Sequence, residues 1–157
     1  MTGDTPRAVV RRLYDLISGP ADHARPWDGV RELFHADALL HSELTLPDGS
    51  HQSGRWTVDE FCAAAAEEYR KTGFWEREIA ARVERFGAIA QVWSTYESRV
   101  GSLESDPVGR GINSVHLLQQ SGRWRITSLV FQIERGSESI PERYLRPDSS
   151  AGESDTQ

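Results

Sequence analysis

The feature that most constrains the fold is a change in hydrophobic periodicity at Gly73. Before it, apolar residues recur at helical spacing, whereas from Trp75 onward they alternate with charged residues, as in strands with one buried face. These period-two segments continue to Glu134 and are separated by short turns, which is typical of hairpins. Helices followed by a run of strands predict an α+β fold, with the helices packed on one face of an antiparallel sheet.

The helix boundaries are signalled by capping residues. Thr5 is an N-cap candidate, and the proline that follows it is tolerated at the first helical position. Thr57 and Glu60 have the spacing of a capping box, and Gly73 is a stop signal. The sequence therefore predicts helices at 6–18, 27–34 and 58–72, and strands at 39–46, 75–84, 89–100, 111–119 and 124–134.

Composition excludes several classes of protein. The chain has 157 residues, of which 38% are hydrophobic and 27% charged, as expected for one globular domain. A net charge of −6 disfavours nucleic-acid binding, and no apolar run is long enough to cross a membrane. The N-terminus has no signal-peptide pattern, so a cytoplasmic location is expected. We predict one domain at 1–140 and a polar, disordered tail at 141–157.

No motif for a metal or cofactor is visible. Cys62 is the single cysteine, so neither an internal disulfide nor a cysteine-based zinc site can form. The histidines lack the spacing of metal ligands, and there is no glycine-rich phosphate loop. We therefore expect no cofactor and no metal.

Three segments resemble a known family. RPWDGVRELFHADA, ERFGAIAQVWSTYE and RGINSVHLLQQSGRWRITSLVF are similar to the SnoaL-like branch of the nuclear transport factor 2-like (NTF2-like) superfamily. The resemblance extends over roughly Thr5 to Glu134. It implies a cone, in which a bent antiparallel sheet wraps around about three N-terminal helices and leaves an open pocket. The family includes isomerases, cyclases and dehydratases, as well as members without a known reaction, so it implies the fold more strongly than the function.

Turn lengths predict which side chains face the cone. A short turn after Gln120 places Asn113, Ser128 and Gln132 on the inner face, if the tryptophan and isoleucine of GRWRI point inward as the family pattern implies. A turn at Phe86 likewise places Ser94 and Tyr96 inside. The outer face is then expected to carry charged residues and an apolar patch that marks a homodimer interface: Glu76, Glu78, Arg82 and Glu84, and Trp93, Ile112, Leu118, Leu129 and Phe131.

The candidate catalytic residues are His41 and Tyr96. His41 lies on the first strand and could act as a base near neutral pH, although it faces solvent if the leucines of that strand pack inward. Tyr96 and Asn113 could orient a carbonyl, or could be structural. Ser94, Ser128, Gln132 and Tyr69 complete the predicted ligand-binding set. The predicted cone contains no assigned carboxylate, which disfavours an isomerase.

Two hypotheses for function remain open. In the first, the cone binds a small apolar or polycyclic molecule with a carbonyl or hydroxyl group, and acts as an isomerase, cyclase or dehydratase if it is an enzyme. In the second, the protein is a non-catalytic homodimer with an interaction role and a cone filled by side chains. A cavity larger than a few water molecules between the helix of Phe61 and Tyr69 and the sheet favours the first hypothesis.

Overall fold

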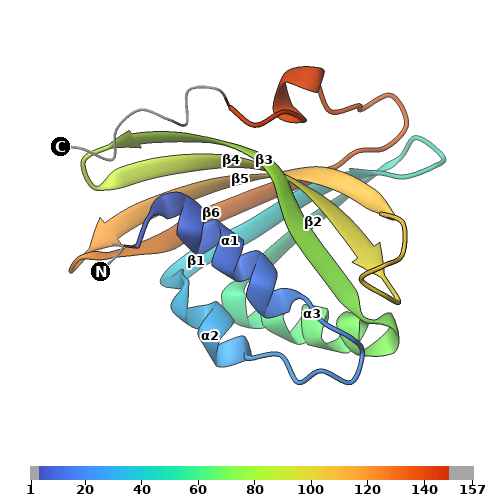
Figure 1. Ribbon diagram of the computed structural model, residues 1–157, viewed down its shortest axis with the longest axis horizontal. Helices are drawn as coiled ribbons and strands as arrows, with labels where there is room; N and C mark the ends of the chain where they lie inside the picture. The colour runs from blue at the N-terminus through green and yellow to red at the C-terminus, as the bar shows by residue number, and fades with distance from the viewer. Residues whose placement is uncertain (1–3, 149–157) are drawn as a thin grey trace.

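The computed structural model describes residues 4–148 of the chain (Figure 1). The predicted helices and strands occur in the predicted order, with one further strand and one short helix. They are α1 (Pro6–Ile17), α2 (Trp27–Glu32), β1 (Phe34–Thr45), β2 (His51–Thr57), α3 (Val58–Thr72), β3 (Phe74–Phe86), β4 (Ile89–Val100), β5 (Gly109–Gln120), β6 (Arg123–Ile133) and a 3-10 helix, η1 (Glu142–Tyr144).

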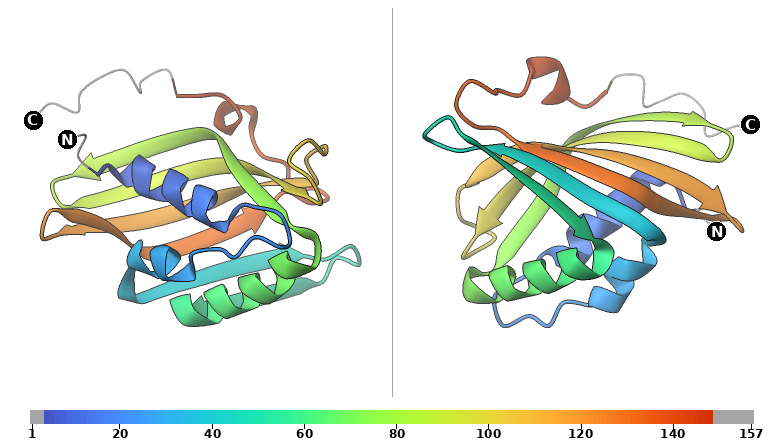
Figure 2. Two further views of the ribbon diagram at one scale, coloured as in Figure 1. Left: turned by 60° about the horizontal axis from the view of Figure 1, so that its bottom comes forward. Right: turned by 180° about the vertical axis from the view of Figure 1, so that it is seen from behind.

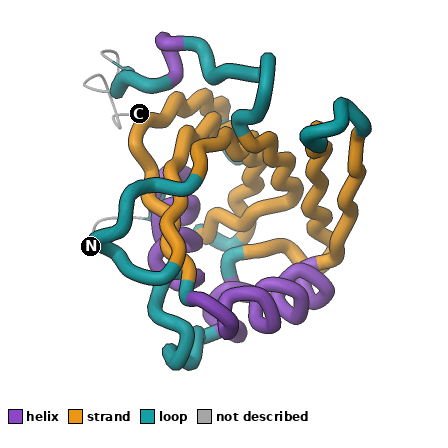
Figure 3. The backbone as a smooth tube through the Cα atoms, turned by 90° about the vertical axis from the view of Figure 1, so that its right-hand side faces the viewer, coloured by secondary structure: helices purple, strands orange, loops and turns teal. Residues whose placement is uncertain are grey.

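The strands form one curved sheet in the order β2-β1-β6-β5-β4-β3. Neighbouring strands are antiparallel, except that β1 runs parallel to β6. All three α-helices lie on the concave face, whereas the segment that contains η1 crosses the convex face (Figures 1 and 2). The tube in Figure 3 shows the sheet bending around the helices. The predicted α+β cone is therefore confirmed.

Capping explains where the helices begin and end. The Thr5 hydroxyl accepts a hydrogen bond from the Ala8 amide at the start of α1. The predicted capping box at the start of α3 is present, and Gly73 ends that helix with a φ of 75°, which favours glycine. The apolar side of α1 then packs against the sheet and is buried.

The elements α2, β1 and β2 differ from the sequence prediction. The second helix ends at Glu32, and β1 begins at Phe34 rather than at residue 39. The short strand β2 was not predicted, because its sequence HQSGRWT has no apolar alternation. It forms by pairing with β1 across the turn at Asp48 and Gly49, where Gly49 has a φ of 83°.

Two β-bulges change which side chains face inward. In β3, Glu78 pairs with Tyr96 and Ala80 with Thr95, so Ile79 is an extra residue. In β6, Ile126 pairs with Leu117 and Ser128 with His116, so Thr127 is extra. A bulge bends its strand, which suits a sheet that must curve around helices. Beyond each bulge, every side chain lies on the opposite face of the sheet from the one that regular alternation would give it.

The bulges overturn part of the predicted register. Trp124 and Ile126 point inward and are buried, as predicted. Beyond Thr127, however, the predicted facing is wrong: Leu129 and Phe131 pair with the inward-facing Val115 and Asn113, respectively. Ser128 and Gln132 therefore face outward. In the β3–β4 hairpin the turn is formed by Gly87 and Ala88 rather than at Phe86, and Ala81 pairs with Ser94.

The end of the described chain packs on the convex face. The Thr95 hydroxyl donates to the Tyr144 carbonyl oxygen at 2.6 Å, and the Arg82 guanidinium donates to the Arg143 carbonyl oxygen at 3.0 Å. Part of the segment that the sequence assigned to the tail is thus held against β3 and β4, through Arg143 and Tyr144. The rest of the expected tail, 149–157, lies outside the described residues.

Candidate functional site

A cavity of about 250 Å³ lies between the helices and the concave face of the sheet. Its walls are mainly apolar and include Leu13 and Ile17 from α1, Phe61 from α3, and Leu40 and Leu129 from the sheet. The polar residues at its lining come from α3 and from three neighbouring strands: Tyr69, Glu76, Tyr96, Ser98, Arg110 and Asn113. A mainly apolar pocket with a few polar groups is the usual form of a small-molecule site.

Glu76 faces this cavity because of the bulge in β3. The sequence prediction placed Glu76 on the outer face, which is wrong, since the extra residue Ile79 reverses the facing of the part of β3 that precedes it. Within residues 4–148, no side chain donates a hydrogen bond to the Glu76 carboxyl. Burial raises the pKa of Glu76 to about 8, from an ordinary value of 4.5. The carboxyl group that sequence reasoning could not find is thus present in the cone.

Three tyrosines surround Glu76. Burial, and secondarily the charge of Glu76, raises the pKa of Tyr14, Tyr69 and Tyr96, so all three hydroxyls stay protonated. Tyr96 lies on β4, where it pairs with Gly111 of β5. A Cβ at Gly111 would lie 2.5 Å from the Tyr96 hydroxyl oxygen, so glycine makes room for that hydroxyl. Within the described chain, the Tyr96 hydroxyl has no hydrogen-bond partner and remains available to a ligand.

Asn113 lies on β5 at the cavity, and hydrogen bonds on the side away from the cavity fix its side chain. Its side-chain amide donates to the Tyr14 hydroxyl at 2.9 Å, and that hydroxyl is 2.8 Å from Ser94 Oγ. Ser94 donates to Glu78 at 2.7 Å. Glu78 also faces inward because of the bulge, where Arg7 and Arg11 bind its other oxygen at 2.8 and 3.1 Å. Tyr14 was not singled out from the sequence, because a tyrosine on an apolar helix face normally indicates packing.

Aromatic rings form the wall next to Glu76. Tyr69 stacks on Phe74 with their ring centroids 4.2 Å apart, and the ring centroid of Trp27 lies 6.5 Å from that of Tyr69. Arg25 lies over the Tyr69 ring and donates to the carbonyl oxygens of Ile17 and Gly19. These contacts fix Tyr69 at the cavity, where the sequence predicted it. The Arg25 guanidinium also caps the C-terminal end of α1.

The structure brings some predicted site residues together and separates others. Tyr69, Tyr96 and Asn113 line the cavity. Ser94 faces inward but is fully buried behind it. Ser128 and Gln132 face outward because of the bulge at Thr127, and Gln132 donates to Glu138.

His41 does not reach the cavity. Leu40 lines the cavity, so His41, the next residue on β1, points to the convex face. There it pairs with Val130, which is 46% exposed. The leucine side of β1 packs inward, which is the arrangement in which His41 faces the outside.

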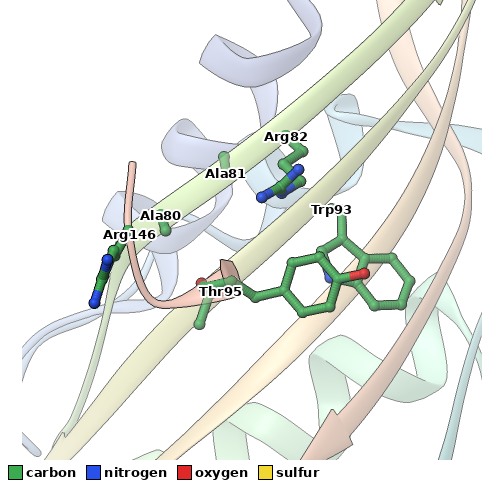
Figure 4. A pocket seen from close by; sticks show the side chains of 7 residues that line it. Ala80, Ala81, Arg82, Trp93, Thr95 and Arg146 are labelled. Carbon is green, nitrogen blue, oxygen red and sulfur yellow. Dashed lines mark hydrogen bonds between the residues drawn. The ribbon is translucent and has the colours of Figure 1, made fainter. Parts of the chain in front are cut away.

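A depression on the convex face offers no second site. It is lined by residues of β3 and β4, including Arg82, Trp93 and Thr95 (Figure 4). Tyr144 fills it, with its ring centroid 5.5 Å from that of Trp93, and no space remains for a water molecule.

Among residues 4–148, no group of three or more histidine, cysteine or acidic side chains could hold a metal ion. Nor does the described part of the chain contain a helix suited to crossing a bilayer.

The fold is similar to that of several solved structures, although the sequence matches no protein-family model and no curated protein. A protein of unknown function from Mycobacterium tuberculosis has a TM-score of 0.63 at 18% identity, and the match covers 86% of this chain and 74% of that one. An NTF2-like protein of unknown function from Pseudomonas putida has a TM-score of 0.60 at 15% identity, covering 84% and 86% of the two chains. One from Pseudomonas aeruginosa has a TM-score of 0.60 at 12% identity, covering 82% and 98%. These similarities show an NTF2-like fold.

Proposed function

We propose that this NTF2-like chain binds a small, mainly apolar molecule in its cavity and catalyses a proton transfer on it, with Glu76 as the acid–base group. The observation that carries the proposal is the position of Glu76. Its carboxyl faces the cavity without a partner in the described chain, and burial raises its pKa to about 8. A general acid or base is most effective when its pKa is near the working pH.

The volume of the cavity limits the ligand. A dry apolar cavity of about 150 Å³ in another protein binds benzene. The cavity here is about 250 Å³, so by the same scaling it accepts a molecule of roughly ten non-hydrogen atoms, about two fused rings. A volume of this size argues against the alternative in which side chains fill the cone.

The surrounding groups suit proton abstraction next to a carbonyl. Ionised Glu76 can take a proton from the carbon beside the carbonyl group, and the Tyr96 hydroxyl can donate to the oxygen on which negative charge develops. The two residues lie on the same face of adjacent strands, because Glu76 pairs with Ser98, two residues from Tyr96. Return of the proton to another atom completes an isomerisation, and loss of a hydroxyl completes a dehydration. Both reactions belong to the SnoaL-like classes that the sequence resemblance implies.

The proposal is tested with 2-tetralone, an apolar bicyclic ketone of the expected size. In D2O, the protein should accelerate exchange of the protons on the carbons beside the carbonyl, as measured by NMR. Glu76→Gln should lower this rate by roughly 10²–10⁴-fold, because it removes the base. The rate for the native protein should rise with pH up to about 8, the pKa of Glu76, and then level off.

Glu84→Gln is the matched control, since Glu84 is an exposed glutamate on the same strand. It should exchange protons as fast as the native protein. An unchanged rate in Glu76→Gln would exclude Glu76 as the base. If the native protein binds 2-tetralone without accelerating exchange, the cavity binds ligands but does not catalyse proton transfer.

A further inference from the structure

We infer that Asn113 presents its side-chain carbonyl oxygen to the cavity, so that this part of the site selects a ligand with a hydroxyl or N–H donor. The inference rests on the proposed function and narrows its ligand class. It follows from the positions of the hydrogen atoms in a chain of hydrogen bonds that runs from Asn113 through Tyr14 and Ser94 to an ion pair between β3 and α1.

The chain of hydrogen bonds is anchored at Glu78. The guanidinium groups of Arg7 and Arg11 bind Oε1 of Glu78, whose side chain is 3% exposed. A carboxylate held by two cations accepts hydrogen bonds and cannot donate them. Ser94 lies 2.7 Å from Oε2, so the Ser94 hydroxyl must donate to Glu78.

The remaining hydrogens are then determined. A serine hydroxyl has one hydrogen, and Ser94 uses it toward Glu78. The Tyr14 hydroxyl, 2.8 Å from Ser94 Oγ, must therefore be the donor in that contact. Its own oxygen is left as an acceptor for the group 2.9 Å away on Asn113. That group must be the amide nitrogen, because a carbonyl oxygen there would face another oxygen with no hydrogen between them.

The amide of Asn113 is therefore fixed in one orientation. Tyr14 and Ser94 are buried, and Asn113 is 6% exposed, so water does not compete for these contacts. Within the described chain, Oδ1 of Asn113 has no hydrogen-bond partner, and the residue lines the cavity. Tyr96 offers the cavity a donor, whereas Asn113 offers an acceptor. A hydroxyl on the ligand satisfies Asn113, but a ketone oxygen at the same point meets a second acceptor.

The test compares two probes with the same skeleton, 2-tetralol and 2-tetralone, by isothermal titration calorimetry. Asn113→Leu should weaken binding of the alcohol by about tenfold or more, because one ligand hydrogen bond is lost. It should change the affinity for the ketone by less than about twofold, since the ketone binds through Tyr96. Ser128→Ala, on the outer face of β6, is the control and should leave both affinities unchanged.

A second variant keeps the test valid if Asn113→Leu does not fold. Tyr14→Phe removes the hydroxyl that orients the amide, so Asn113 can turn and the difference between the two probes should shrink. If Asn113→Leu weakens ketone binding instead, or weakens neither probe, the inference is wrong. If the native protein binds neither probe, the proposed function is wrong and the inference falls with it.

Discussion

Glu76 shows how the surroundings of one residue decide its chemistry. The chain has many glutamates, and some on the outer face of the sheet, such as Glu84, are exposed to solvent. Glu76 instead lies beside Phe74 and Tyr69 in a mainly apolar cavity, where its charge is less well solvated than at the surface. The ionised form is disfavoured and its pKa rises to about 8. At this position a carboxyl group can hold or accept a proton near neutral pH.

The raised pKa of Glu76 predicts a pH-dependent stability. Between about pH 4.5 and pH 8 the folded protein keeps a proton that the unfolded chain has lost, so stability falls as the pH rises through this range. Glu76→Gln lacks this titration. We expect the melting temperature of the variant, relative to the native protein, to increase from pH 4.5 to pH 8 and to stay constant above it. If the melting temperatures of the two proteins changed in parallel with pH across this range, burial would not raise the pKa of Glu76.

At the scale of elements, the two bulges control the inner face of the sheet. Without Ile79 as an extra residue, regular alternation would turn Glu76 and Glu78 to the outside. Without Thr127 as an extra residue, Leu129 and Phe131 would lie outside. The implausibly apolar outer face predicted there was the one sequence signal of this bulge. For Leu129 and Phe131, a shift of register rather than an interface explains it.

The contact between α1 and β3 depends on Glu78, and this predicts a measurable stability effect. Replacing both Arg7 and Arg11 by glutamine leaves the Glu78 carboxylate buried without a cation. We expect a loss of roughly 1–3 kcal/mol in the free energy of unfolding, because both arginines are partly exposed. Adding Glu78→Gln should recover part of this loss. Urea denaturation measures all three proteins.

An exposed ion pair provides the control for this prediction. Arg70 pairs with Glu67 on the surface of α3, and both side chains are largely exposed. Arg70→Gln should change the free energy of unfolding by less than about 1 kcal/mol. If the variant with glutamine at both Arg7 and Arg11 unfolded at the same urea concentration as the native protein, the ion pairs with Glu78 would not stabilise the packing of α1 on the sheet.

At the scale of the whole molecule, the C-terminal segment covers the convex face. The Tyr144 ring lies against Trp93 and under Arg82, whose guanidinium carbon is 5.3 Å from the ring centroid. We expect Tyr144→Ala to expose Trp93, to speed hydrogen exchange of its indole N–H in NMR, and to lower the melting temperature by about 2–4 °C. Arg146→Ala, which removes an exposed side chain of the same segment, should do neither. Unchanged exchange at Trp93 would mean that Tyr144 does not cover it.

The homodimer remains a prediction, with a smaller surface than the sequence suggested. Of its five residues, Leu129 and Phe131 face the cavity side and Trp93 is covered by Tyr144. Ile112 and Leu118 still face outward, because they alternate on β5 with the inward-facing Asn113 and Leu117. Substituting Phe131 would therefore disturb its stacking with Trp56, 6.0 Å away, rather than an interface.

The sequence by itself determined the type and order of most elements. Caps at Thr5 and Thr57, and the change of period at Gly73, act through neighbouring residues, so they can be interpreted without the fold. The facing of Tyr96 and Asn113 was also predictable, because these residues lie on strand segments not displaced by a bulge. Local chemistry was sufficient for these features.

Only the tertiary structure decided the chemistry of the cavity. The bulges at Ile79 and Thr127 arise because a sheet that wraps around helices must bend, and alternation along one strand carries no information about where it bends. The parallel pairing of β1 with β6 likewise depends on residues far apart in the chain. Glu76 became a cavity carboxyl, and His41 was excluded from the cavity, through these long-range contacts.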